Sequence, residues 1–492
     1  MLSILSPPLW VRLPAESTVK DFPRSAELLL DKMGERGYAD LRRKDHPRTL
    51  MGERHRKEAE KPALCTNFDL FVDQSHALGA QKIFNDPVYG FLEIDRQLIL
   101  KVIDHPIFQR LRRIQQLGLS SLVYPGALHT RFHHALGALH LMQQALEVLQ
   151  RKGVVITEEE KQGAYLAILL HDIGHGPFSH ALEEQLVSGV SHEQLSYLLM
   201  ERFNALLDGE LELAVRIFRG AYTKRFLHQL VTGQLDVDRL DYLRRDSFYT
   251  GVSEGVIGSD RIIKMLHVRH NRLVVEQKGI YSVEKFLIAR RLMYWQVYLH
   301  KTVVGAERLL NSLWRRARDL VQAGTALPGA PSVRFFLERP SHVEPDAEVL
   351  DHFADLDDFD LLSAIKAWSR HEDVILSTLS RRMLERRLLK AHLSGSPPPH
   401  HHLDSLKEML PRHLHLPPEA GDYLVLHGRV SNQAYRRSEE QIEILYRDGR
   451  VVDLVQASDQ SKLNILDQAV EKYFLGYPKE LDAHMKTDHL WK

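Results

Sequence analysis

A short stretch in the middle of the sequence places four residues that can bind a metal ion or move a proton within ten positions. An apolar run, 168–170, leads to the adjacent pair His171 and Asp172, and His175 and His180 follow. The apolar residues predict a helix that carries the pair at its buried end. A buried aspartate costs several kcal/mol unless it is compensated, and a metal ion is the simplest compensation. Taken alone, the pair fits a helix C-terminus ended by glycines better.

A second histidine-bearing helix is predicted upstream of this stretch. Residues 124–140 indicate a loop that runs into a helix containing His133 and His134. Adjacent side chains on a helix point in different directions, so only one of the two can face a site shared with His171.

A third segment, 236–246, holds four carboxylates and three arginines. Asp238, Asp241 and Tyr242 fall at positions i, i+3 and i+4, which is one face of a helix. A salt-bridged surface helix explains this pattern equally well. The apolar residues Leu235 and Leu240 beside the acids indicate partial burial, which favours a functional role.

Together, His134, His171, Asp172 and Asp238 supply two imidazoles and two carboxylates from three predicted helices. An octahedral ion bound by them keeps room for water and a phosphate oxygen, and it can polarise a phosphorus centre. The single cysteine, Cys65, leaves nitrogen and oxygen ligands, which favours Mg, Mn, Fe or Zn. Arginines that could neutralise phosphate charge stand in or near these segments: Arg131, Arg239 and Arg290.

Composition describes an ordinary globular protein of two or three domains. The 492 residues are 44% hydrophobic and 26% charged, and 65 basic residues balance 65 acidic ones. Overall charge therefore gives no sign of a nucleic-acid partner. No apolar segment approaches the roughly 20 residues of a membrane helix. One cysteine excludes an intramolecular disulfide and fits a reducing compartment, so we expect a cytoplasmic protein.

Helices are expected to position these residues, with strands at both ends of the region. A hairpin is predicted over 82–94 and strands over 271–276, 423–430 and 441–455. Residues 324–340 are expected to form a loop and 394–402 a linker that includes three adjacent histidines. The predicted helices are 95–103, 106–118, the helix that contains His133 and His134 and runs through Leu149, 165–170, 281–322, 346–368, 377–392 and 464–473.

Several long motifs occur in an order that resembles the HD-domain superfamily. The resemblance is closer to the deoxynucleoside triphosphate (dNTP) triphosphohydrolases, which include the mammalian SAM-and-HD-domain enzyme and bacterial relatives. It covers residues 82–301. Its motifs are Asn85-Asp-Pro-Val-Tyr-Gly, Phe108-Gln-Arg-Leu-Arg, Gln116-Leu-Gly, Arg131-Phe-His-His-Ala-Leu-Gly, His171-Asp-Ile-Gly-His-Gly-Pro-Phe-Ser-His and Asp236-Val-Asp-Arg-Leu-Asp-Tyr.

The resemblance implies a mainly α fold, with an HD-domain helical core, small β elements and an α+β C-terminal region. We accordingly expect an N-terminal extension of unknown role (1–80), a catalytic core (81–322) and a C-terminal region for oligomerisation or regulation (323–492). The implied reaction releases a deoxynucleoside and intact triphosphate.

The resemblance also assigns roles by position. The implied ligands of a divalent metal ion are His134, His171, Asp172 and Asp238. The α-phosphate would contact Arg131 and His175, while His180, His192 and Glu183 would manage protons. The outer phosphates would be held by Arg239, Tyr242 and Arg290. The sugar 3′-hydroxyl would bond Gln116 and Asp246, Tyr242 would exclude a 2′-hydroxyl, and Tyr298 would flank the base.

Relatives are allosteric tetramers, and this chain has residues at matching positions. A guanine nucleotide would be recognised by Lys82, Asp104 and Arg112, and the phosphates of a second, dNTP effector by Arg261, His300 and Lys301. Three positions depart from the family: His133 replaces a glutamate, Arg239 a lysine, and Leu299 a polar residue near the base, which leaves base preference open.

Two alternatives stand beside dNTP hydrolysis. An HD phosphohydrolase could act on another phosphate ester, such as a nucleoside monophosphate, cyclic dinucleotide or alarmone. A non-catalytic nucleotide sensor or nucleic-acid-binding protein would belong to another class, against which the intact metal ligands and His180 argue.

Overall fold

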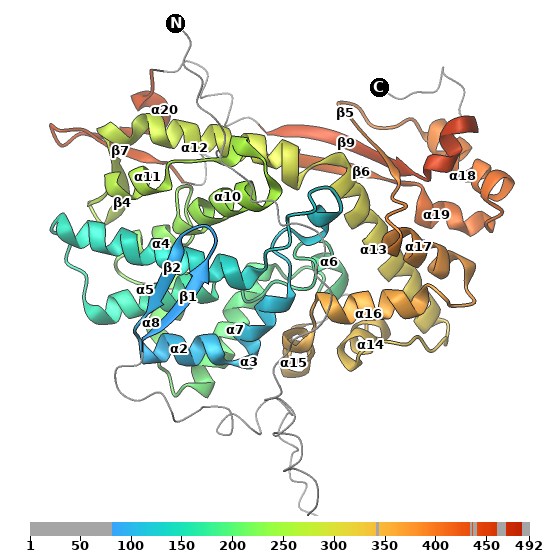
Figure 1. Ribbon diagram of the computed structural model, residues 1–492, viewed down its shortest axis with the longest axis horizontal. Helices are drawn as coiled ribbons and strands as arrows, with labels where there is room; N and C mark the ends of the chain where they lie inside the picture. Colours follow the sequence, from blue (N-terminus) through green and yellow to red (C-terminus); the bar gives the residue numbers. More distant parts are fainter. Residues whose placement is uncertain (1–80, 341–343, 433–434, 436–439, 460–468, 485–492) are drawn as a thin grey trace, which may run out of the picture. The chain divides into compact units, whose positions relative to one another are not determined.

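The computed structural model describes residues 81–340, 344–432, 435, 440–459 and 469–484, all within one compact unit (Figure 1). The predicted N-terminal extension lies outside the described residues. This unit is mainly helical with small sheets, some of them C-terminal, so the predicted fold class is confirmed.

Its first helices are α2 (Gln97–Asp104), α3 (Pro106–Gln109), α4 (Arg131–Arg151), α5 (Glu158–Leu170), α6 (Glu183–Leu186), α7 (His192–Leu206), α8 (Glu212–Phe218), α9 (Arg225–Val231), α10 (Val237–Thr250), α11 (Ser259–Met265), α12 (Ile280–Met293) and α13 (Lys301–Gln322). The later helices are α14 (Pro331–Glu338), α15 (Ala347–Asp355), α16 (Asp358–Trp368), α17 (Val374–Leu384), α18 (His400–Leu414), α19 (Gly421–Leu424) and α20 (Leu454–Ala457).

Helix α4 packs against both α5 and α10, and these three helices carry the predicted metal ligands. Helix α5 begins at a capping box formed by Thr157 and Glu160, and it is buried from Gly163 to Leu170. Helix α10 begins where the Asp236 side chain accepts a hydrogen bond from Arg239 N. Each of these helices starts at a defined cap, which fixes where its functional side chains emerge.

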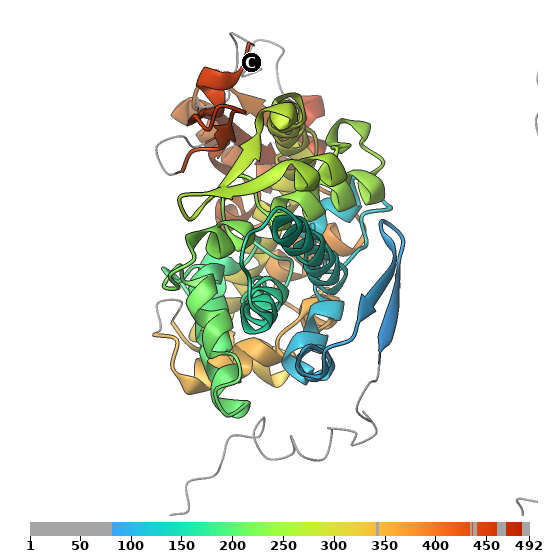
Figure 2. The same cartoon turned by 90° about the vertical axis from the view of Figure 1, so that its left-hand side faces the viewer.

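Three small sheets accompany the described helices. The hairpin of β1 (Lys82–Asp86) and β2 (Gly90–Ile94) stands beside α4, as Figure 2 shows in blue and teal. A second sheet has the order β3 (Leu266–Arg269), β4 (Arg272–Glu276), β7 (Glu443–Leu445) and β8 (Val451–Asp453). The third has the order β5 (Lys390–Ser394), β9 (Val470–Tyr477) and β6 (Leu426–Asn432). Because β4 pairs in parallel with β7, the C-terminal segment is joined to the central region.

Several helix predictions are wrong in part. The helix predicted over 346–368 is divided into α15 and α16, because Leu356 and Asp357 are extended. The predicted helix 106–118 consists of α3 and a 3-10 turn to Arg113, since Ile114 is extended and Gln115 bridges to Thr130. The helix predicted over 377–392 ends at Leu384, and its last residues belong to β5. Of the predicted final helix 464–473, residues 464–468 lie outside the described residues and 470–473 belong to β9. That strand pairs on both sides, and tertiary pairing outweighs a local helical pattern.

Two segments predicted to lack regular structure contain helices. Residues 324–340 include α14, which starts at Pro331, and the fixed φ of proline suits a first helical position. The three histidines predicted in a linker form the first turn of α18. Conversely, the predicted continuous helix 281–322 is interrupted after α12 by a π-helical turn, Tyr294–Tyr298, before α13 begins.

Candidate active site

Four side chains from three helices meet at the centre of the unit. His134 comes from α4, His171 and Asp172 from the end of α5, and Asp238 from the first turn of α10. Asp238 Oδ1 lies 3.1 Å from His134 Nε2 and 3.4 Å from His171 Nε2. Asp172 Oδ1 is 3.3 Å from His171 Nε2, and Asp172 Oδ2 is 3.6 Å from His134 Nε2. The structure therefore brings together the four residues predicted as metal ligands.

Both imidazoles are oriented by their other ring nitrogen. His134 Nδ1 is 2.7 Å from Asp241 Oδ2, and His171 Nδ1 is 2.6 Å from the carbonyl oxygen of Ile168. Carboxylate and carbonyl oxygens accept hydrogen bonds, so each Nδ1 carries a proton and each Nε2 faces the cluster, where it can give up a proton to bind a metal ion. Neither Nε2 atom has a hydrogen-bond partner among the described residues. This donor set, with two carboxylates beside two imidazole Nε2 atoms, fits a divalent metal ion that displaces the Nε2 protons.

The charge of the cluster favours a cation. Burial opposes protonation of His134, but the carboxylates of Asp238 and Asp241 outweigh it and raise the pKa of His134 to about 10. The pKa of His171 is also raised, because Asp172 and Asp238 overcome burial. Protons stabilise this cluster, and a metal ion would replace them as the compensating positive charge.

Arg131 and His175 lie against Asp172, on the side of the cluster formed by the loop after α5. Arg131 forms an ion pair with Asp172, and its Nε donates to Ser179 Oγ at 3.0 Å. His175 Nε2 is 3.3 Å from Asp172 Oδ1, and its buried Nδ1 has no hydrogen-bond partner among the described residues. Burial and the charge of Arg131 hold the pKa of His175 well below its usual range, so this imidazole is neutral.

His180, His192 and Glu183 form a second cluster beside His175. Glu183 is 3.1 Å from His180 Nδ1 and 3.0 Å from His192 Nδ1, so one carboxylate orients both rings. The rings of His175 and His192 stack at 4.1 Å. Burial lowers the pKa of His192, but the hydrogen bond and charge of Glu183 outweigh it and raise that pKa. His180 is the exposed member, which gives the cluster contact with solvent.

A group of arginines and tyrosines lies on the α10 and α12 side of the cluster. The charges of Arg290 and Arg239 both lower the pKa of Tyr242, although burial raises it overall. Arg239 forms an ion pair with Asp236. Among the described residues, Arg239 Nε and Arg290 Nε and Nη1 are buried without a hydrogen-bond partner. Buried, unpaired guanidinium N–H groups are donors suited to an anion.

Of the residues predicted to contact sugar and base, Asp246 is already bonded to other side chains, whereas Gln116 has an oxygen without a partner among the described residues. Asp246 is 1% exposed, and its two oxygens are engaged by His129 Nε2 at 2.7 Å and Tyr298 OH at 2.8 Å. The Tyr298 ring lies 6.1 Å from the ring of Tyr242. Gln116 Oε1 has no hydrogen-bond partner in the described part of the chain. Leu299 packs against the cluster of Val304, Ala391 and Phe474 that adjoins the C-terminal strands.

The predicted effector residues fall into one assembled group and one dispersed group. Lys82 and Asp104 form a 2.9 Å ion pair, and the Arg112 guanidinium lies 3.6 Å from the ring centre of Phe132. Asp104 also influences the pKa of Arg112. In contrast, Arg261 lies on α11 and donates to Lys278 O, whereas His300 caps the start of α13 and Lys301 follows it.

Several residues that hold the site in place were missed from the sequence. Asp241 orients His134, and His129 holds Asp246. Asp358, on α16, accepts from Phe178 N at 2.7 Å and from Gln115 N at 2.9 Å. The position of Asp241 three residues after Asp238 was a usable signal. Asp358 is 180 residues from Phe178, so no local pattern could have indicated its role.

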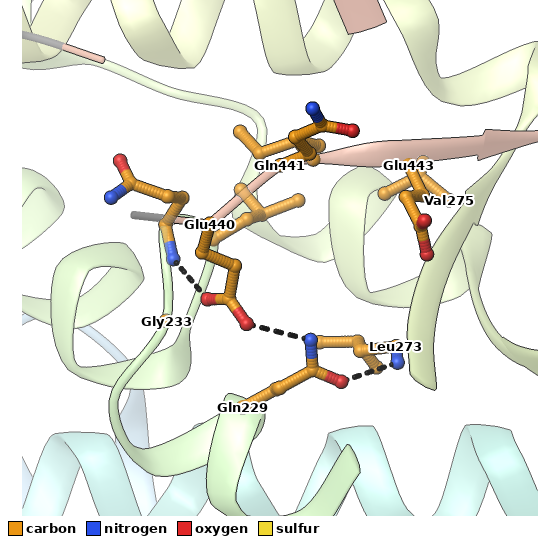
Figure 3. A pocket seen from close by; sticks show the side chains of 10 residues that line it. Gln229, Gly233, Leu273, Val275, Glu440, Gln441 and Glu443 are labelled. Atoms are coloured by element: carbon orange, nitrogen blue, oxygen red, sulfur yellow. Dashed lines mark hydrogen bonds between the residues drawn. The ribbon is translucent and has the colours of Figure 1, made fainter. Parts of the chain in front are cut away.

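A pocket with a mixed polar and apolar lining lies next to the segment that precedes α10 (Figure 3). Glu440 accepts from Gln229 Nε2 at 2.8 Å and from Gln234 N at 3.3 Å, while Gln229 Oε1 accepts from Leu273 N. None of its lining residues belongs to the predicted site. The contacts tie the C-terminal segment to the start of the helix that carries Asp238.

Two known families match this chain. The HD domain matches residues 131–246, which include all four predicted metal ligands, and the HD associated region matches residues 257–327. The uncharacterized protein YwfO of Bacillus subtilis is 31% identical over 424 residues, covering 82% of this chain and 94% of YwfO. This chain therefore belongs to the HD-domain proteins, among the members that carry an HD associated region.

Other relatives have names that refer to an activity. A phosphohydrolase of known structure from Bacteroides thetaiotaomicron is 49% identical, with a TM-score of 0.78, covering 81% of this chain and 100% of that one. A deoxynucleoside triphosphate triphosphohydrolase SAMHD1 homolog of Dictyostelium discoideum is 29% identical over 327 residues, 62% of this chain and 60% of that protein. In the part of the chain that the structure describes, no helix has the length and apolarity needed to cross a bilayer.

Proposed function

We propose that this protein is a metal-dependent phosphohydrolase that converts a dNTP, dGTP among them, to a deoxynucleoside and triphosphate. The observation that carries the proposal is the combination of a buried His–Asp cluster with buried guanidinium groups. Among the described residues, the Nε2 atoms of the two clustered histidines, which would contact a metal ion, have no hydrogen-bond partner. The Nε atoms of Arg239 and Arg290, which would contact an anion, have none either. A polyphosphate bound to the ion and the arginines would satisfy both groups, whereas a neutral substrate would leave the cations uncompensated.

The metal ion would be held by His134, His171, Asp172 and Asp238, and Mg, Mn, Fe and Zn all suit such ligands. When bound, a divalent ion lowers the pKa of coordinated water and polarises a phosphoryl oxygen. The ion pair with Asp172 and the bond to Ser179 keep Arg131 in one orientation, so that it and neutral His175 can hold the α-phosphate. Arg239, Arg290 and Tyr242 would bind the outer phosphates.

Proton transfer to the leaving 5′-oxygen is assigned to His180 or His192. Glu183 accepts from Nδ1 of each ring, so a second proton resides on Nε2 when the ring is charged. The raised pKa of His192 favours the protonated ring that a proton donor needs. Glu183 is thus proposed to orient the rings of His180 and His192 and to raise the pKa of His192.

Recognition of the deoxynucleoside is proposed for Gln116, Asp246, Tyr242 and Tyr298. The unpaired oxygen of Gln116 supports a bond to the sugar 3′-hydroxyl. Asp246 would have to exchange or share its bonds to His129 and Tyr298. Because both oxygens of Asp246 are already bonded, a second candidate is favoured, an HD phosphohydrolase that acts on another nucleotide ester and makes no contact with the sugar hydroxyls.

We also propose activation by a guanine nucleotide bound at Lys82, Asp104 and Arg112. The second effector site, a homotetramer and a regulatory role for the C-terminal region (323–492) are further proposals. The assembled Lys82–Asp104 pair beside Arg112 supports the first of these. If GTP activates the wild-type protein and Arg112→Ala equally, this assignment is wrong.

Product analysis tests the proposed function. Each dNTP is incubated with the full-length protein and Mg, Mn or Fe, with and without GTP or dGTP, and the products are separated by chromatography. Triphosphate and deoxynucleoside are expected. Monophosphate or orthophosphate alone would instead support the second candidate, and no turnover of any nucleotide would refute both.

A further inference from the structure

A buried chain of ionised side chains connects the β1–β2 hairpin to one of the clustered histidines. Asp86, at the end of β1, accepts from Arg245 Nη1 at 2.7 Å, and Arg245 contacts Asp241, which contacts His134. Arg245 and Asp241 are both 0% exposed. Burying these charges is unfavourable unless every partner is in place, so removing one partner leaves a buried charge uncompensated.

The contact between Asp241 and His134 decides how that histidine faces the cluster. The 2.7 Å bond fixes the imidazole ring and its proton at Nδ1, which leaves Nε2 directed at Asp172 and Asp238. A carboxylate in this position also increases the electron density that Nε2 offers to a metal ion.

Arg245 in turn fixes Asp241. Its Nε donates to Asp241 Oδ2 at 2.9 Å and its Nη2 to Asp241 Oδ1 at 3.0 Å, which is a two-point contact that lysine cannot make. Gly137, one turn after His134, leaves the space for this pair. A Cβ atom there would lie 2.1 Å from both Arg245 Nη2 and Asp241 Oδ1.

Asp86 anchors the far end of the chain in the hairpin. Its Oδ1 accepts from Val88 N and Tyr89 N within the turn, while its Oδ2 holds Arg245. The hairpin turn and the arginine therefore share one carboxylate, and a shift of the turn changes the position of Arg245.

We propose that Asp241 and Arg245 are positioning residues for His134, and that Asp86 lets the β1–β2 hairpin control the metal affinity of the site. The inference rests on the proposed function in one respect, because it takes His134 as a metal ligand. It adds that metal binding depends on a hairpin from outside the helices that carry the ligands.

Titration of metal-free, full-length protein with Mn²⁺ by calorimetry tests the proposal without any substrate. Asp241→Asn keeps the shape but removes the charge, and its Mn²⁺ affinity should fall about 10- to 100-fold. Asp86→Asn, which touches no ligand, should lower the affinity about threefold to tenfold. Glu147→Gln is the matched control, because this exposed carboxylate on α4 pairs with Arg151 and lies outside the Asp86–Arg245–Asp241 chain, and its affinity should stay within about twofold of wild type.

The melting temperature of each metal-free variant separates positioning from folding. A purely structural role would lower this temperature and leave the Mn²⁺ affinity of the folded protein unchanged, and that result would overturn the proposal. If Asp241→Asn does not fold, the Mn²⁺ affinity of Asp86→Asn is the test of the proposal. A wild-type protein that binds no divalent ion would instead refute the metal site itself, and with it the proposed function.

Discussion

At the scale of single residues, His171 and Asp172 show how position along a helix places common side chains where they can bind a metal ion. The helix α5 is buried over its last eight residues, so the pair emerges where little water can compensate its charge. Asp238 reaches the same point from another helix, at 3.4 Å from His171 Nε2. The cluster is therefore expected to need a cation for function.

We expect His171→Ala and Asp172→Ala to lose bound metal and to reduce turnover at least about 1,000-fold, because each removes a ligand. Elemental analysis of the purified variants and product chromatography measure the two effects. His401→Ala, an exposed histidine on α18, should behave as wild type. Turnover retained in either ligand variant would reject the site.

Glu183 offers a pH-dependent test of the proposed proton donor. Its carboxylate raises the pKa of His192, and activity that needs protonated His192 is present below that pKa and lost as the pH rises through it. In Glu183→Gln, the pKa of His192 should fall, so the alkaline limb of the kcat profile should move about one pH unit lower. Glu184→Gln, the exposed neighbour, is the control. If the alkaline limb of the kcat profile of Glu183→Gln does not move, His192 is not the proton donor.

At the scale of elements, the segment between α15 and α16 supports the loop that contains His175. Arg110 is fully buried and donates to Leu356 O and to His175 O, while Asp358 holds Phe178 N and Gln115 N. Phe178 has a positive φ of 53°, a conformation that a non-glycine residue adopts only when neighbouring contacts enforce it. The loop after α5 is thus held in shape by a segment far along the chain.

Asp358→Ala should leave two buried N–H groups unpaired and lower the free energy of unfolding by about 2–4 kcal/mol. Because the loop also carries the proposed phosphate and proton-transfer residues, kcat should fall more than KM changes. Denaturant unfolding and steady-state kinetics measure both effects, with the exposed Asp404→Ala on α18 as control. A stability loss without any change in kcat would limit Asp358 to a structural role.

At the scale of the whole molecule, one acid inside α13 should make stability depend on pH. Burial raises the pKa of Glu307 to about 7. Between its unfolded pKa, near 4.5, and 7, the unfolded chain loses a proton that the folded protein keeps, so stability decreases as the pH rises.

Glu307→Gln removes this titration. The variant should match wild type at pH 4 and be more stable by about 1–3 kcal/mol at pH 8, since the glutamine stays neutral. Thermal or denaturant unfolding across this range measures the difference. Equal stability of the two proteins at pH 8 would show that Glu307 ionises without cost.

The sequence by itself determined the classes of ligand and the helices that carry them, because periodicity and helix caps are local properties. It also indicated the C-terminal strands and the hairpin over 82–94. It could not indicate that 470–473 join a central strand, since that depends on partners far along the chain. Only the tertiary structure decided which ring nitrogen of His134 faces the cluster, that Asp86 is connected to this ring through Arg245 and Asp241, and that Asp358 supports the loop that contains His175. These contacts join residues more than 100 positions apart, and a hydrogen bond requires a distance and a direction that sequence spacing does not set over such lengths.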